Sequence, residues 1–64
     1  MRVNGEETTL GDKCTLADFL KREGYDISRV AVEKNGEVIP KTQYDAEILH
    51  EDDKLEIVTF VGGG

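Results

Sequence analysis

The sequence contains one cysteine, Cys14, and no long apolar run. A single cysteine excludes an internal disulfide, so the chain is not a secreted disulfide scaffold and suits a reducing compartment. No apolar stretch approaches the length of a signal peptide or a membrane span. We therefore expect a soluble, cytoplasmic protein with no membrane partner.

Positive charge is also scarce, with 8 Lys and Arg against 14 Asp and Glu and a net charge of −6. Nucleic-acid binding needs clustered positive charge to neutralise phosphates, and the sequence has no such cluster. An anionic membrane surface is disfavoured for the same reason. The acidic balance either steers a basic protein partner toward the chain or merely keeps a small domain soluble.

The length of 64 residues allows one domain. A chain this short buries only about 60% of the surface that it exposes when unfolded, which leaves little room for both a core and a deep cleft. A small carrier or binding module is therefore favoured over a self-sufficient enzyme. We expect it to be a monomer when free, with a domain over residues 1–61 and a flexible glycine tail over residues 62–64.

No group of residues predicts catalysis or a metal site. Cys14 has no histidine near it in sequence, and a packed cysteine beside a helix start is the simpler interpretation. His50 and the acidic residues after it match no zinc or calcium spacing and are typical of a solvated turn. The glycines of NGEE and NGEV lack phosphate-loop spacing. We therefore predict no catalytic residue, no metal and no bound cofactor.

Two Asn-Gly pairs predict β-hairpins, because a type I′ turn needs positive φ at both central residues. The predicted strands are Met1–Val3 and Glu6–Leu10 around Asn4-Gly5, and Arg29–Lys34 and Glu37–Ile39 around Asn35-Gly36. Pro40 then indicates an edge strand, since proline cannot donate to a ladder.

A helix is predicted over Leu16–Glu23, with Thr15 as its N-cap and Gly24 after its end. Its apolar residues recur on one face. The expected core combines that face with apolar strand residues: Leu16, Phe19, Leu20, Val30, Val32, Leu55 and Ile57.

The segment Lys41–Leu49 is expected to be irregular or one short helical turn, pinned by Tyr44 and Ile48. A polar turn, His50–Asp53, precedes the last strand, Lys54–Val61. This strand is the longest and most apolar, so we place it between the first and third strands. The result is an α+β fold, a mixed sheet of about five strands on one main helix.

The last strand carries the most informative pattern. Alternation places Leu55, Ile57 and Val61 on one face, with Thr59 among them, and Val58 and Phe60 on the other face with Glu56. If the first set faces the helix, Val58 and Phe60 form an exposed apolar patch. Such a patch favours partner binding, unless another segment covers it.

The strand runs directly into Gly62, Gly63 and Gly64. Glycines without side chains make a thin segment that can enter a narrow channel in a partner. An α-carboxylate at its end is a poor electrophile until it is activated.

The chain resembles the ThiS family of sulfur carriers in thiamine biosynthesis, which have the ubiquitin-like β-grasp fold. The resemblance covers the whole length and rests on VNGEE, TLADFLKREG, VAVEKNGEVIPKTQY and the final GGG. One departure is the turn in HEDDKLEIV, where Asp52 replaces the family's usual glycine.

The resemblance implies a role for the glycines. A ThiF-like adenylating enzyme would use ATP to attach AMP to Gly64, and sulfur from a persulfide would replace AMP to leave a thiocarboxylate, 1-thioglycine. Thiazole synthase would then receive the sulfur. Gly63 is the required neighbour, Gly62 is part of the tail, and Val58 and Phe60 match positions that meet the partner. The chain would be a protein co-substrate and not an enzyme.

Three alternatives remain open at this point: a molybdopterin-type sulfur carrier, a ubiquitin-like protein modifier, and a plain binding module with inert glycines. The first is disfavoured because those carriers are usually longer and match the middle segment less well. A modifier would end on a target lysine.

Overall fold

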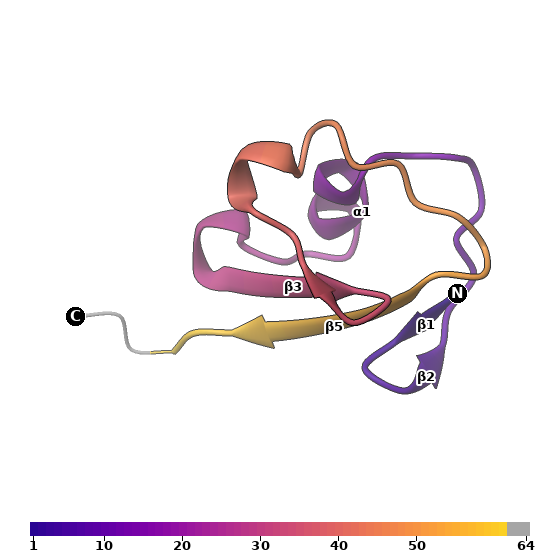
Figure 1. Ribbon diagram of the computed structural model, residues 1–64, viewed down its shortest axis with the longest axis horizontal. Coiled ribbons are helices and arrows are strands. Elements are labelled where there is room, and N and C mark those ends of the chain that lie inside the picture. The colour runs from indigo at the N-terminus through magenta and orange to yellow at the C-terminus, as the bar shows by residue number, and fades with distance from the viewer. Residues whose placement is uncertain (62–64) are drawn as a thin grey trace.

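The computed structural model describes residues 1–61, which form a mixed five-stranded sheet packed on one α-helix (Figure 1). The elements in chain order, with η for a 3₁₀ helix, are β1 (Arg2–Val3), β2 (Glu6–Glu7), α1 (Leu16–Arg22), η1 (Ile27–Arg29), β3 (Val30–Lys34), β4 (Glu37–Val38), η2 (Lys41–Gln43) and β5 (Lys54–Thr59).

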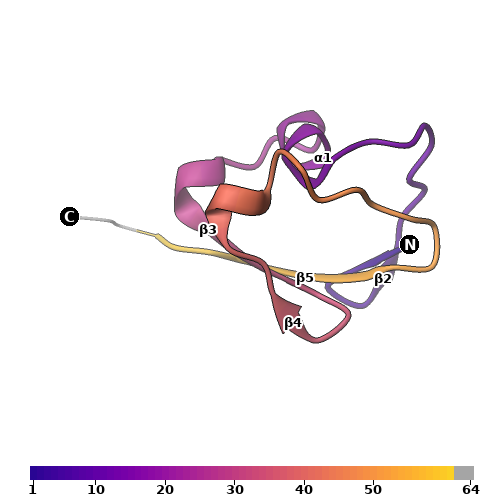
Figure 2. The same cartoon turned by 45° about the horizontal axis from the view of Figure 1, so that its top comes forward.

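The strand order is β2-β1-β5-β3-β4, so the last strand lies in the centre of the sheet. It pairs in parallel with β1 and antiparallel with β3, whose residues match β5 from Val30↔Thr59 to Lys34↔Leu55. Both views show α1 on one side of β3 and β5 (Figures 1 and 2). The predicted α+β arrangement and the central position of the last strand are confirmed, and the fold is a ubiquitin-like β-grasp.

Both predicted hairpin turns are present. Asn4 and Gly5 have φ of 52° and 82°, and Asn35 and Gly36 have φ of 53° and 85°. These positive values are the conformation that a type I′ turn demands.

The return strands are shorter than predicted. The first ends at Glu7 and not at Leu10, because the chain then bends to bury Leu10 in the core at 2% exposure. The second ends at Val38, and Pro40 follows it. β4 is an edge strand, as the proline indicated.

The helix begins as predicted and ends one residue early, at Arg22. The Thr15 hydroxyl accepts a hydrogen bond from the Asp18 N–H at 3.1 Å, which satisfies a donor that has no partner within the helix. Gly24 has a φ of 82°, a value typical of the residue that follows a helix end.

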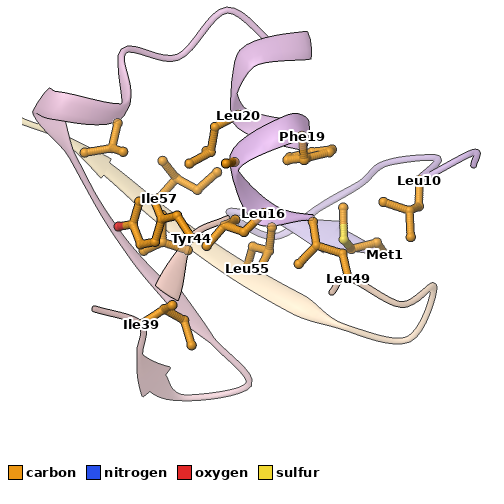
Figure 3. Close-up of a cluster of buried hydrophobic side chains, with 13 residues drawn as sticks. Met1, Leu10, Leu16, Phe19, Leu20, Ile39, Tyr44, Leu49, Leu55 and Ile57 are labelled. Atoms are coloured by element: carbon orange, nitrogen blue, oxygen red, sulfur yellow. The ribbon is translucent and has the colours of Figure 1, made fainter. Parts of the chain in front are cut away.

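All predicted core residues are buried between the sheet and α1 (Figure 3). The core also includes apolar residues that the helix and strand patterns did not mark: Met1, Leu10, Ala17, Ile39, Tyr44 and Leu49. No helix among residues 1–61 has the length and apolar character that a membrane span requires.

The segment before β5 is anchored differently from the prediction. Tyr44 is buried as expected, but Ile48 is exposed and its neighbour Leu49 is fully buried. Ile48 forms a β-bridge with Thr15, and the Leu49 N–H donates to the Cys14 carbonyl at 3.0 Å. This extended backbone directs alternate side chains to opposite sides, which places Leu49 in the core.

The predicted solvated turn contains one buried acid, Asp53, at 5% exposure. Its carboxylate accepts hydrogen bonds from the Asn35 amide at 2.9 Å and the His50 N–H at 2.8 Å, and the Lys34 ammonium lies 3.8 Å away. Burial raises the pKa of this carboxyl, but the two hydrogen bonds and Lys34 lower it more, so its pKa lies below its ordinary value. Asp53 thus ties the start of β5 to the second hairpin.

Asp52, which departs from the family's usual glycine, causes no backbone strain. Among residues 1–61, only Asn4 and Asn35 combine a positive φ with a side chain. The turn therefore does not use the conformation that requires glycine at this position.

We predict that Asp53→Asn destabilises the fold by about 1–3 kcal/mol at neutral pH, because an amide has one accepting oxygen and so loses one of the two charge-assisted hydrogen bonds of the carboxylate. The folded-state pKa of Asp53 is depressed, so its contribution is present above the unfolded value, near 3.8, and is lost as pH falls through the folded value. Urea denaturation at neutral and acidic pH measures both effects.

The matched control is Asp52→Asn, which removes the same charge from the exposed neighbouring position. It should leave the free energy of unfolding nearly unchanged. Equal stability of Asp53→Asn and the parent at neutral pH would contradict the assigned role of this carboxylate.

Candidate functional site

The face of the sheet turned away from α1 is here called the open face. The candidate site is the part of this face at the end of β5. Leu55 and Ile57 point into the core, at 1% and 6% exposure. Val58 and Phe60 are exposed by 57% and 54%. The predicted division of the strand is therefore confirmed for these four residues.

The end of the strand differs from the prediction. Val61 was placed on the core face with Thr59 among its residues, but Val61 is 90% exposed and Thr59 is also exposed. The strand ends at Thr59, and the chain continues past the region that α1 covers (Figure 1). The alternation of buried and exposed side chains along β5 therefore does not extend to Val61.

Hydrogen bonds fix the backbone near the end of β5 on both of its edges, at Phe60 and at Ile57. On the β3 side, the Phe60 N–H donates to the Arg29 carbonyl at 2.7 Å, one residue beyond the strand itself. On the β1 side, the Asn4 side chain bonds the backbone of Ile57: its amide donates to the carbonyl at 3.1 Å, and its oxygen accepts from the N–H at 2.7 Å.

The short length of β1 explains the role of Asn4. β1 pairs with β5 only as far as Val3↔Leu55, so the Ile57 groups on that side have no strand partner. A backbone donor and acceptor without partners are costly, and the Asn4 amide satisfies both. Sequence reasoning identified Asn4 as a turn residue and missed this contact, which spans 53 positions.

The open face carries more apolar surface than the prediction assigned. Val38 of β4 is 71% exposed. It pairs with Glu33 on β3, while Ala31 pairs with Val58 on β5. Val38 could have been predicted from the strand alternation. Val32 faces the core, so the next residue, Glu33, faces away from it, and Val38 lies opposite Glu33 across the hairpin.

The other candidate residues do not form a site. Cys14 is half-buried beside the start of α1, as expected of a packed thiol. Within residues 1–61, no three His, Cys, Asp or Glu side chains gather closely enough to hold a metal ion. His50 is exposed, and its backbone N–H serves the Asp53 carboxylate.

Gly62, Gly63 and Gly64, the predicted tail and acceptor, lie outside the described residues. The division into a domain over 1–61 and a tail over 62–64 stays a prediction. What the structure does place is the segment that leads to them, Val58–Val61, beside an exposed apolar surface.

Comparison with known proteins gives consistent matches. The chain is 44% identical over 62 residues to a thiazole synthase from Paramagnetospirillum magneticum, covering 97% of this chain and 19% of that protein. It is 37% identical over 65 residues to a sulfur carrier protein ThiS from Bacillus subtilis, covering 100% of this chain and 98% of that protein.

The fold is similar to a crystal structure of a thiamine biosynthesis protein (ThiS) from Geobacter metallireducens, with a TM-score of 0.79 and 32% identity. The match covers 98% of this chain and 96% of that chain. The ThiS family model matches residues 1–64. The β-grasp sheet, the exposed end of β5 and these matches agree, and the chain belongs to the ThiS family.

Proposed function

We propose that this protein is a sulfur carrier in thiamine biosynthesis and acts in the cytoplasm as a protein co-substrate rather than as an enzyme. The observation that carries the proposal is the match over the full length of the chain to a relative that is a sulfur carrier protein ThiS. The absence of any predicted catalytic group in the sequence is consistent with a reaction performed by a partner.

The proposed reaction takes place at Gly64. A ThiF-like adenylating enzyme would bind ATP and join AMP to the α-carboxylate of Gly64, with release of pyrophosphate. AMP is a good leaving group, so the outer sulfur of a persulfide could displace it to form an acyl disulfide. A second thiol would then reduce the S–S bond, which leaves the thiocarboxylate and converts the two thiols to a disulfide. This thioglycine would donate its sulfur to form the thiazole ring.

Thiazole synthase is the proposed acceptor. The chain spans 19% of the length of the thiazole synthase that it matches. Similarity to a segment within a thiazole synthase favours the thiazole pathway over molybdopterin synthesis, and it supports thiazole synthase as the acceptor of the sulfur.

The geometry of β5 supports delivery of the tail to a partner. Val58 pairs with Ala31 of β3 and the Phe60 N–H donates to the Arg29 carbonyl, so both residues have fixed positions on the open face. Three residues beyond Val61 span at most about 10 Å. A partner that docks on Phe60 would therefore have the reacting carboxylate within a short distance of that contact.

We predict that Phe60→Asp weakens binding to the adenylating enzyme by at least about tenfold, because the aspartate would be desolvated without a mate in an apolar contact. Phe60 is 54% exposed, so the melting temperature should change little. Calorimetric titration of each variant into the enzyme measures the effect.

Thr42→Asp is the control, since it adds the same charge at an exposed position of η2. Its affinity should match that of the parent. Unchanged affinity of a folded Phe60→Asp variant would show that this part of the open face does not contact the enzyme.

A further inference from the structure

Two glutamates on the open face lie directly opposite each other. Glu33 on β3 pairs with Glu56 on the adjacent β5. Residues opposite each other in an antiparallel pair have Cβ atoms about 4.5–5.5 Å apart, and like charges there are destabilising. Within residues 1–61, neither carboxylate has a cation close enough to form an ion pair.

The neighbouring cation on the open face is Lys54, which lines one surface hollow together with Glu33 and Glu56 but forms no ion pair with either. Lys54 begins β5, two positions before Glu56, and pairs with Arg2 of β1. The Arg2 guanidinium lies 3.8 Å from the Glu7 carboxylate and donates to the Gly5 carbonyl at 3.3 Å. Two cations therefore lie at the start of β5, and one of them, Lys54, borders both glutamates.

Apolar side chains lie beside the two acids. Val38 is the neighbour of Glu33 on the β4 side. One step along the sheet face, Ala31 pairs with Val58, and Phe60 follows on β5. The surface thus combines the exposed Val58 and Phe60 with two adjacent carboxylates that form no ion pair within residues 1–61.

We propose that an arginine of the adenylating enzyme binds between Glu33 and Glu56, with its alkyl stem on Val58. An arginine fits because its planar guanidinium has donors on several sides and can contact both carboxylates, while its stem packs on apolar surface. This inference rests on the proposed function, since the occupant is the enzyme that activates Gly64.

The pairing of like charges supports this assignment. A cross-strand Glu-Glu pair costs stability in the free chain, and departures of this kind are expected where function requires them. A bound guanidinium would remove the repulsion and gain two charge-assisted hydrogen bonds. The contact would also fix the orientation of the carrier, because it adds a second point of attachment apart from Phe60.

The test uses the variant Glu33→Gln with Glu56→Gln, which keeps the side-chain shapes and removes both charges. The control is Asp12→Asn with Asp45→Asn, which changes the net charge equally at two exposed positions away from the sheet. Affinity for the chain's own ThiF-like enzyme is measured by titration calorimetry at low and high salt, and the melting temperature of each free chain is recorded.

The expected result is a dissociation constant raised about tenfold at low salt for the double glutamine variant, with a weaker dependence on salt than the parent shows. Its melting temperature should equal or exceed that of the parent, since the repulsion is gone. The control should bind within about twofold of the parent, because distant charges are screened.

Parental affinity of the double glutamine variant, or an equal loss in the control, would overturn the arginine contact. If the parent is still adenylated, as pyrophosphate release shows, the carrier function stands without that contact. A parent chain that its enzyme never adenylates would overturn both proposals together.

Discussion

Removal of Gly64 is expected to abolish ATP-dependent adenylation of the chain. The reacting group in our proposal is the α-carboxylate of Gly64, held by a partner that places it against the α-phosphate of ATP. Without Gly64 the carboxylate stops about 3.3 Å short of that position. Since a misplacement of about 1 Å can cost about 100-fold in rate, turnover should fall by at least that factor.

Addition of one alanine after Gly64 should have the same effect, because the carboxylate then lies too far along the channel. The core described above lies within residues 1–61, so the melting temperature of both variants should equal that of the parent. Pyrophosphate release with the cognate adenylating enzyme and ATP measures the outcome. Parental turnover by either variant would contradict the assignment of Gly64 as the acceptor.

Replacement of Phe19 by alanine is expected to destabilise the fold by about 3–5 kcal/mol, which is the usual cost of deleting a buried aromatic ring. Phe19 is 1% exposed in the core between α1 and the sheet (Figure 3), and the Arg22 guanidinium lies 5.0 Å from its ring centroid. A domain of this size has a total stability of about 5 kcal/mol. The variant should therefore be partly or largely unfolded at room temperature.

The same substitution at Phe60 is the matched control, because that ring is 54% exposed and lies on the open face. Phe60→Ala should change the free energy of unfolding by less than about 1 kcal/mol. Urea denaturation followed by circular dichroism gives both values. A Phe19→Ala variant that unfolds at the urea concentration of the parent would show that the ring does not stabilise the core.

Local sequence patterns predicted most of the fold because they reflect local physical constraints. The Asn-Gly pairs require positive φ, Thr15 can cap a helix that begins at Leu16, and the alternation of β5 separates Leu55 from Val58. These features are decided within a few residues. The structure confirms each of them.

The features that sequence reasoning missed depend on contacts between distant segments. The Asn4 side chain bonds Ile57 across the sheet, and Asp53 is buried against the turn at Asn35. Neither residue type predicts burial or long-range bonding by itself. Leu49 replaced Ile48 as an anchor for a similar reason, since only the bridge between Ile48 and Thr15 decides which of the two faces inward.

The same difference between local features and features set by distant contacts applies to the candidate site. Val58 and Phe60 could be predicted because one strand's alternation is sufficient to expose them. The facing of Glu33 and Glu56 could not, because it depends on the register between β3 and β5, which is a property of the assembled sheet.

The mass of the intact chain shows whether Gly64 carries sulfur. The chain is purified from its own cells while they synthesise thiamine, and its mass is compared with that of the unmodified sequence. We expect a fraction heavier by the difference between one sulfur and one oxygen atom, with the change located at Gly64 by fragmentation. An unmodified mass under all thiamine-producing conditions, or covalent attachment of the chain to lysines of other proteins, would contradict the role of sulfur carrier.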